Sequence, residues 1–312
     1  MCALAAGAEI AALPPTGSPA KFSLEECRRG DAFFDDLVRE FALRHGVEPR
    51  ALGVRTLLHL PRVAGHSGRV TRRQLETELR NRAVDLRADQ AKVLELIPSD
   101  AYSLQDLRFA EYDAHEAAAI FSHLHYLRSA RAGSRNFALL DPVHGRPVTL
   151  CSVSPLEWTA VGKQLQKQFG VPMARMWDVS RVYSFDVAPS NAISHLLSKV
   201  RTVMRQSGGS VELLTTAVDP NLGFTGSSYR AANWQQWLSI RPRPYLYVDA
   251  RYMSPRQLRS TFGTANLAEV RIGSGALVEQ SRTRLLDSAM FCCRLRGETE
   301  YVPVEERHRL RR

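Results

Sequence analysis

Cysteine and long apolar runs are both scarce in this 312-residue chain. Its five cysteines form no CxxC pair, and Cys292 and Cys293 are adjacent, so neither a zinc site nor a disulfide framework is indicated. No stretch approaches the roughly 18 apolar residues that a membrane helix requires. The alanine-rich opening lacks the basic region of a secretory signal. We therefore expect a cytoplasmic protein with reduced thiols and no membrane contact.

Acidic residues are too few to balance the basic ones, and the formal net charge is +10. Only five of the 42 basic residues are lysine. The surplus lies in the second part of the chain, because residues 1–100 hold 15 basic and 14 acidic side chains whereas residues 101–312 hold 27 and 18. Such a surplus suits a polyanion such as DNA or tRNA. It is equally compatible with ordinary solubility.

The hydrophobic pattern divides the chain near residue 100. Residues 1–20 are small and proline-bearing, and we expect them to be flexible. Residues 21–100 are predicted to form a helical module, because apolar residues recur at spacings of three and four, and Gly46 and Thr71 are placed to end one helix and begin another. Residues 101–312 alternate predicted helices and strands, as expected of an α/β domain with one mixed sheet flanked by helices.

The second part has a definite order of predicted elements. Its strands are expected over residues 136–140, 147–153, 181–187, 211–219 and 244–253, and its helices over 113–130 and 190–206, with a loop followed by a helix within 223–237. In "SPRQLRSTFG", Ser254 and Gln257 fit a capping box and Gly263 fits the stop of a short helix. The tail "ERHRLRR" is expected to be a frayed basic end.

The stretch "GFTGSSYRAANWQQW" places Tyr229, Asn233 and Trp234 after a loop of small residues. The order of strand, amphipathic helix, strand and tyrosine-bearing helix resembles the GNAT acyltransferase superfamily. In that superfamily a tyrosine in a pattern like Y-x-x-x-G/N-F/W protonates the departing thiolate, so the resemblance implies that role for Tyr229. On a helix, positions i and i+4 share one face, and we expect the Tyr229 phenol and the Asn233 amide to point into the same cleft. A tyrosine packed in the core is the alternative.

Narrower resemblances concern shorter motifs. "HYL" at 125–127, "NAISHLL" at 191–197 and "YRAANW" at 229–234 resemble a domain of the Druantia-type anti-phage protein A family. "YRAANW" followed by "YVDARYMSPRQL" resembles phage Mom-type proteins, GNAT-like enzymes that modify adenine in DNA, over residues 113–290. The resemblance implies an acyl- or aminoacyltransferase that forms an amide bond and works with a nucleic acid. A non-catalytic DNA-binding component of a phage-defence system is the alternative.

One segment departs from the GNAT pattern. Acetyl-CoA-dependent members carry a glycine-rich loop whose backbone N–H groups hold the donor's diphosphate at a helix N-terminus. This chain has "VAPSNAISH" there, where Pro189 removes one N–H group and no glycine is present. We therefore expect no certain cofactor, and an acyl donor that is an aminoacyl-tRNA rather than acetyl-CoA. The acceptor is expected to be a DNA base or a small-molecule amine.

Further residues are candidates for function, each against an ordinary structural alternative. His125 is a candidate proton shuttle or a packed histidine, and Asp219 is a candidate base or a turn residue. His123 and His125 lack a third ligand, so no metal site is expected, and a serine nucleophile is disfavoured because G-x-S-x-G is absent. The expected substrate-binding residues are Ser228, Asn233, Trp234 and Asp249. The expected nucleic-acid contacts are Arg181, Arg201, Arg205, Arg230, Arg256 and Arg259.

Overall fold

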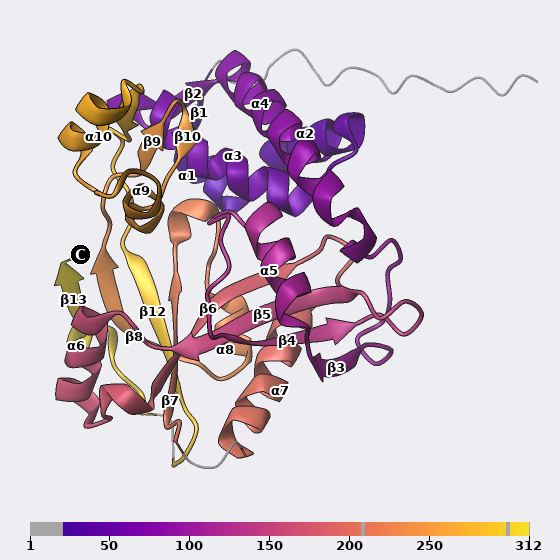
Figure 1. Cartoon of the computed structure of the whole chain (residues 1–312), viewed down its shortest axis with the longest axis vertical. Coiled ribbons are helices and arrows are strands. Elements are labelled where there is room, and N and C mark those ends of the chain that lie inside the picture. Colours follow the sequence, from indigo (N-terminus) through magenta and orange to yellow (C-terminus); the bar gives the residue numbers. More distant parts are fainter. Residues whose placement is uncertain (1–20, 207–209, 298–299, 312) are drawn as a thin grey trace, which may run out of the picture.

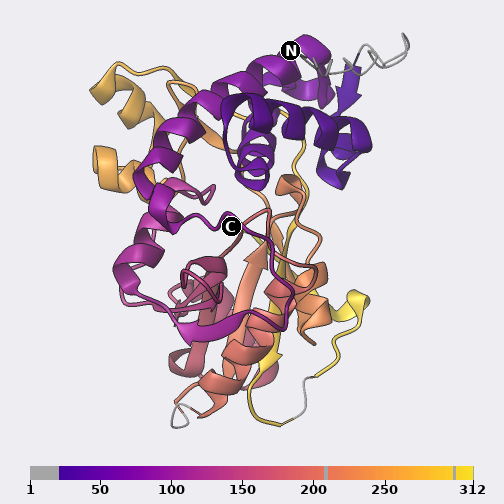
Figure 2. The ribbon, with the colours of Figure 1, turned by 90° about the vertical axis from the view of Figure 1, so that its right-hand side faces the viewer.

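The structure is a computed structural model that describes residues 21–206, 210–297 and 300–311. The N-terminal segment expected to be flexible, residues 1–20, lies outside these ranges. A layer of helices covers one end of a large sheet, as Figures 1 and 2 show from two directions. Across the described ranges, no helix is both long enough and apolar enough to cross a membrane.

The N-terminal region is helical and follows its capping residues. Thr71 accepts a hydrogen bond from the backbone of Gln74 and completes a capping box, and Gly46 ends a helix in the left-handed conformation, as the sequence predicted. A short antiparallel ladder ties the start of this region to the segment before its last long helix. The elements are β1 (Lys21–Ser23), α1 (Leu24–Arg29), α2 (Ala32–His45), α3 (Pro49–Val63), β2 (Arg69–Thr71) and α4 (Arg72–Gln90).

The main sheet has eight strands in the order β13-β8-β12-β7-β6-β5-β4-β3. Most neighbours are antiparallel, whereas the β6–β7 and β8–β13 pairs are parallel. The expected α/β region with one large mixed sheet is therefore confirmed. Its strands are β3 (Arg108–Glu111), β4 (Arg135–Leu140), β5 (Pro147–Pro155), β6 (Met176–Ser184), β7 (Leu213–Val218), β8 (Gln235–Arg241), β12 (Ser288–Arg294) and β13 (His308–Arg311).

Helices cover both faces of this sheet, so strands such as β4 and β5 are buried along nearly their whole length and successive side chains enter different cores. On β4, Ala138 and Leu140 belong to the core shared with the N-terminal helices, whereas Phe137 and Leu139 pack in a second core with α7. On β12, Cys292 and Cys293 point into different cores and are free thiols. The helices of this region are α5 (Ala114–His123), α6 (Thr159–Phe169), α7 (Ala192–Gln206) and α8 (Ser227–Ala231).

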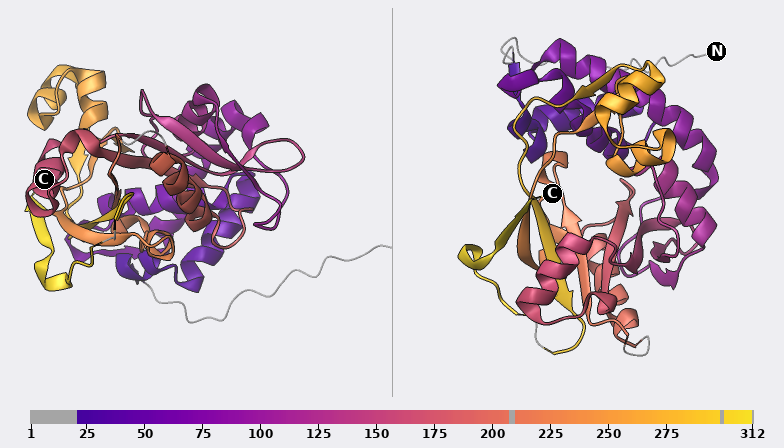
Figure 3. Two further views of the ribbon diagram at one scale, coloured as in Figure 1. Left: turned by 90° about the horizontal axis from the view of Figure 1, so that it is seen from below. Right: turned by 60° about the vertical axis from the view of Figure 1, so that its left-hand side comes forward.

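The strand expected over residues 244–253 is instead a hairpin in a separate sheet. Asp249 and Ala250 have positive φ angles and turn the chain between its two halves. The small sheet has the order β10-β9-β11 and lies with two helices beside the N-terminal layer, as the right panel of Figure 3 shows. Ser254, Gln257 and Gly263 cap the first of these helices as predicted. The elements are β9 (Leu246–Val248), β10 (Arg251–Tyr252), α9 (Pro255–Phe262), α10 (Leu267–Ser274) and β11 (Val278–Gln280).

Two further expectations about local structure were wrong. The tyrosine-bearing helix α8 has only five residues, because Asn233 adopts a φ of 62° and the chain then continues as β8. The Tyr229 carbonyl accepts from the N–H of Trp234, which closes this turn. The C-terminal tail is not frayed over its described part: β13 pairs parallel with β8, and Leu310 packs against the core under α6.

Candidate functional site

The central feature of the site is the point where β6 and β7 part. Their parallel pairing covers only Met176 to Asp178 against Leu213 to Thr215. The residues that follow on both strands, 179–182 and 216–218, line a cavity of about 230 Å³, here named the tyrosine cavity. The Thr216 hydroxyl donates to the Val179 carbonyl across 3.0 Å. A side-chain hydrogen bond thus replaces part of the backbone hydrogen bonding between the two strands. The gap that remains between them is large enough for a ligand.

Tyr229 lines the tyrosine cavity from α8. Its ring packs against Trp234 and Phe291, with centroids 5.5 and 5.7 Å away, and its hydroxyl lies 3.4 Å from that of Thr216. Burial raises the pKa of the Tyr229 phenol well above its ordinary value. The phenol therefore keeps its proton at neutral pH.

The glycine that precedes α8 explains the small residues of this loop. Gly226 has a φ of 74°, and a Cβ atom there would lie 2.5 Å from the Phe291 ring. Only glycine has both the conformation and the room. The close approach of the loop to β12 places Tyr229 and Ser228 beside the gap between the strands, where both line the cavity.

His125 lies on the tyrosine cavity from the segment after α5 and is 5% exposed. Burial, with the positive charges of Arg181 and Arg55, lowers the pKa of His125 well below its ordinary value, so the ring is neutral. Its Nδ1 accepts from the Leu127 N–H across 3.2 Å, which assigns the remaining proton to Nε2. Among the described residues Nε2–H has no acceptor, so it is a neutral donor available to a ligand.

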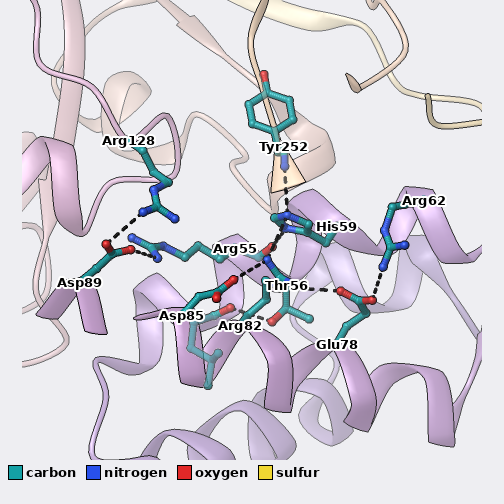
Figure 4. A network of polar contacts seen from close by, with 11 residues as sticks. Arg55, Thr56, His59, Arg62, Glu78, Arg82, Asp85, Asp89, Arg128 and Tyr252 are labelled. Carbon is teal, nitrogen blue, oxygen red and sulfur yellow. Dashed lines mark hydrogen bonds and ion pairs between the residues drawn. The ribbon is translucent and has the colours of Figure 1, made fainter. Parts of the chain in front are cut away.

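The segment that carries His125 is held by a buried ionic network, shown in Figure 4. Asp89 on α4 pairs with Arg55 at 2.8 Å and with Arg128 at 3.0 Å. Arg55 also donates to the His123 carbonyl. The two contacted positions, His123 and Arg128, lie two residues before and three residues after His125. The N-terminal helices therefore fix the position of this histidine.

Arg181 approaches the cavity from β6 and is also tethered. Its guanidinium donates to the carbonyl and hydroxyl of Ser129, at 2.9 and 3.0 Å, and so holds the same segment from the sheet side. Gln257 on α9 donates to the Leu127 carbonyl across 3.0 Å. Arg181 contributes a positive charge to the cavity lining, and it positions the His125 segment at the same time.

A larger space of about 470 Å³, here named the helix-side cavity, adjoins the tyrosine cavity. The two share lining residues, including His125, Tyr126, Ile193 and Phe224. Its other wall is formed by α1, α2 and α3, which present Arg28, Arg29, Arg39 and Arg50. Asp35 and Asp186 also line this space, and Asp186 pairs with Arg50 at 3.5 Å, so the lining holds an excess of basic over acidic side chains.

The loop between β6 and α7 has some of its backbone N–H groups engaged within the protein. The N–H of Asp186 donates to the Glu48 carboxyl across 2.7 Å, and the N–H groups of Ala188 and Ala192 bond to carbonyls within the loop. Pro189 has no N–H. Glu48 also accepts from the Tyr183 hydroxyl, so a buried carboxyl group lies against the start of this loop.

The expected shared cleft for Tyr229 and Asn233 does not form. Because α8 ends at Ala231, the exposed Asn233 lines a different hollow, together with Trp234, Arg201 and Arg230. Trp234 itself is 2% exposed and contacts Tyr229 through the ring edge. The structure thus separates the tyrosine from its predicted partner.

The remaining predicted residues lie away from the tyrosine cavity. The Asp219 carboxylate accepts from the Tyr245 hydroxyl at 2.6 Å and from Asn221, so it anchors a turn. Asp249 accepts from the N–H of Leu277 at the β9–β10 turn. Arg205 donates to the Leu295 carbonyl, and the exposed Arg256 and Arg259 lie on α9. The structure brings together His125, Arg181, Ser228 and Tyr229.

Several lining residues were missed from the sequence. Tyr126 lines both cavities and stands within the quoted "HYL" motif, so that motif could have indicated it. Thr216 lines the tyrosine cavity from an ordinary strand context and gave no signal, nor did Glu48, a helix-capping residue that contacts the β6–α7 loop. Over the described ranges, no group of three histidine, cysteine, aspartate or glutamate residues could hold a metal ion.

Comparison with protein families identifies the chain through the segment that contains these cavities. The Mom protein family model matches residues 106–289, more than half of the chain. The chain belongs to the Mom protein family. No curated protein matches it. The family segment runs from just before β3 to the start of β12 and includes His125, Arg181 and Tyr229, whereas the N-terminal helices lie outside it.

Solved structures show only slight overall likeness to the chain. One is yncA from Salmonella typhimurium, a candidate acetyltransferase with its cofactor acetyl-CoA, at 11% identity and a TM-score of 0.36, covering 62% of this chain and 97% of that one. Another is a candidate phosphinothricin N-acetyltransferase at 10% identity and a TM-score of 0.32, and the match covers 61% of this chain and 99% of that one. At these scores the likeness carries no conclusion about activity.

Proposed function

We propose that this Mom-family protein is an acyl- or aminoacyltransferase that forms an amide bond and works with a nucleic acid, as acyl donor or as acceptor. The observation that carries the proposal is the tyrosine cavity, where a protonated phenol and a neutral imidazole donor line the gap between two parted strands. Membership of the Mom family favours a base in DNA as the acceptor. The basic surplus of residues 101–312 suits a polyanionic partner.

Tyr229 and His125 have different roles in the proposed acyl transfer. The acceptor amine attacks the acyl carbon, and the bond from that carbon to the leaving oxygen or sulfur breaks. Tyr229 gives its proton to the leaving atom, and the proton lost by the amine restores the phenol, directly or through water. His125 Nε2–H donates a hydrogen bond to the acyl oxygen while negative charge develops on it.

The donor proposed is an aminoacyl ester carried by tRNA rather than acetyl-CoA. In the β6–α7 loop, the Asp186 N–H donates to Glu48, and the N–H groups of Ala188 and Ala192 donate to carbonyls of the loop itself. A tRNA would instead be bound by side-chain charge spread over a broad surface, to which the arginines of the helix-side cavity are suited.

The experiment is a donor and acceptor screen followed by nucleoside mass spectrometry. The protein is incubated with DNA and charged tRNAs, and the Tyr229→Phe variant is compared with Tyr102→Phe, a matched change outside the cavities. We expect a modified base or small amine, with Tyr229→Phe lowering kcat by about 100-fold or more. Unchanged turnover would remove Tyr229 from the mechanism. Tight binding of nucleic acid without any transfer would return the protein to a non-catalytic DNA-binding role, the alternative of the Druantia-type resemblance.

Calorimetry tests the donor separately. We expect acetyl-CoA to give no binding signal, and tRNA binding to weaken by orders of magnitude between low and moderate salt. Micromolar binding of coenzyme A that is insensitive to substitution of the arginines would assign the protein to the acetyl-CoA-dependent transferases.

A further inference from the structure

A third hollow, the arginine pocket, shares no lining residue with the tyrosine cavity. It measures about 630 Å³ and lies among α7, the end of α8 and strands β8 and β12. Its charged lining residues are Arg201, Arg230 and Arg307. No acidic residue appears among the described residues that line it. Three positive charges without a counter-charge in one hollow indicate an anion site.

Two of the three arginines are held in place by the protein. Arg230 donates to the Thr225 carbonyl across 2.8 Å, and its guanidinium lies 5.7 Å from the centre of the Phe291 ring. Arg307 donates through Nε to the Val302 carbonyl across 3.3 Å. Each guanidinium retains further N–H groups, because arginine has five. A ligand would therefore meet donors whose conformational entropy is already partly lost.

The pocket also contains donors that lack an acceptor. Arg201 Nε and Trp234 Nε1 are buried, and neither has a hydrogen-bond partner among the described residues. A buried N–H group without an acceptor is destabilising. Arginine pairs most strongly with planar or tetrahedral oxyanions such as phosphate, and the remaining N–H groups of these guanidinium groups suit such a ligand.

An exposed aromatic ring at the rim indicates what carries the phosphate. Tyr301 lines the arginine pocket and is 73% exposed, and Asn233 beside it is exposed as well. Arginines that follow a backbone, together with an aromatic ring on which a base stacks, are typical of single-stranded nucleic-acid sites. We propose that the arginine pocket binds a phosphate of a nucleic-acid strand, with a neighbouring base stacked on Tyr301. The proposal rests on the nucleic-acid part of the proposed function.

The test measures binding of a labelled single-stranded oligonucleotide by fluorescence anisotropy over a range of salt concentrations. Arg201→Gln and Arg307→Gln are each compared with Arg80→Gln, which removes the same charge from an exposed position on α4. We expect each pocket variant to bind about tenfold more weakly and to lower the salt slope by about 0.7. Arg80→Gln should leave both nearly unchanged. Tyr301→Ala should weaken binding without changing the slope, because stacking releases no counterion.

The outcomes separate this proposal from the function proposed above. If all three pocket variants bind the strand as tightly as the wild-type protein does, the proposal about the pocket is wrong and the proposed function is unaffected. A wild-type protein that binds no strand overturns both the pocket and the nucleic-acid part of the function. Inorganic pyrophosphate serves as the competitor: if it binds as tightly as the strand, the pocket takes a free phosphate compound and the strand is excluded. Thermal melting of each variant confirms that the comparison is between folded proteins.

Discussion

Two buried polar regions lie side by side in this protein and are built in opposite ways. In the network around Asp89, charged groups of α3 and α4 face oppositely charged neighbours, which stabilises them out of water. In the adjacent tyrosine cavity, His125 and Tyr229 are neutral, and the His125 donor lacks a partner among the described residues. Paired charges hold a position, whereas neutral unpaired donors are available to a ligand. Loss of the first should affect stability, and loss of the second should affect turnover.

The largest effect is expected from breaking the ionic network at its centre. Asp89→Asn leaves the buried guanidinium of Arg55 without its partner, and we expect a loss of about 3–5 kcal/mol in the free energy of unfolding. Asp85→Asn is the matched control, because Asp85 pairs with Arg82 at the partly exposed edge of the same network. It should cost under about 1 kcal/mol. Urea unfolding measures both, and equal losses would contradict a central role for Asp89.

The reverse contrast is expected at the tyrosine cavity. Tyr229→Phe removes a hydroxyl whose described contact is the 3.4 Å approach to Thr216. We expect its free energy of unfolding to change by about 1 kcal/mol or less, although turnover falls about 100-fold. A large loss of stability in the same urea experiment would make Tyr229 a structural residue and remove the contrast between the two regions.

The loop that places Tyr229 should contribute less to stability than Asp89 does. Gly226→Ala adds a Cβ atom against the Phe291 ring at a position of positive φ. We expect a loss of about 1–3 kcal/mol, together with reduced turnover because α8 must shift.

Gly145 provides the control for this loop. It has a similar φ of 69° but nothing within 4 Å of an added Cβ atom. Gly145→Ala therefore measures the backbone strain alone, which is about 1 kcal/mol. If both variants lose the same stability and keep full activity, the contact with Phe291 does not position the site.

A graded effect, small over any single pH unit, concerns His59 in the network. Burial, with the charge of Arg82, lowers the pKa of His59 to about 3. Its Nε2 lies 3.3 Å from the Tyr252 N–H and 3.4 Å from Arg82, so it accepts and is unprotonated (Figure 4). The unfolded chain binds a proton below its ordinary pKa of about 6.5, and the folded chain does not. Stability should therefore fall as pH decreases from about 6.5 toward 3, by about 1.4 kcal/mol per pH unit.

Replacement of this histidine isolates its contribution. His59→Gln should remove that slope between about pH 6.5 and 5, before most carboxylates titrate, while leaving the slope due to His125. Denaturant unfolding at several pH values measures it. An unchanged slope in the variant would show that His59 is protonated in the folded protein.

The sequence by itself determined the local elements whose signals are local. Capping residues such as Thr71 and Ser254 and the apolar stripe of α7 depend on neighbours three or four positions away, so the helices they begin were predicted correctly. The family motif around Tyr229 likewise lies within one short segment. His125, Arg181, Ser228 and Tyr229 could therefore be named in advance as candidates, although not as members of one cavity.

Only the tertiary structure decided which of those candidates meet. Whether "YRAANWQQW" continued as a helix depended on the pairing of β8 with β12 and β13, which are distant in sequence, and that pairing turned Asn233 away from Tyr229. The cavity exists because β6 and β7 part after three paired residues. His125 reaches it because Arg55 and Asp89, from helices far earlier in the chain, hold its segment in place. Such long-range contacts compete with local preference and override it where burial is large, so no local pattern could reveal them.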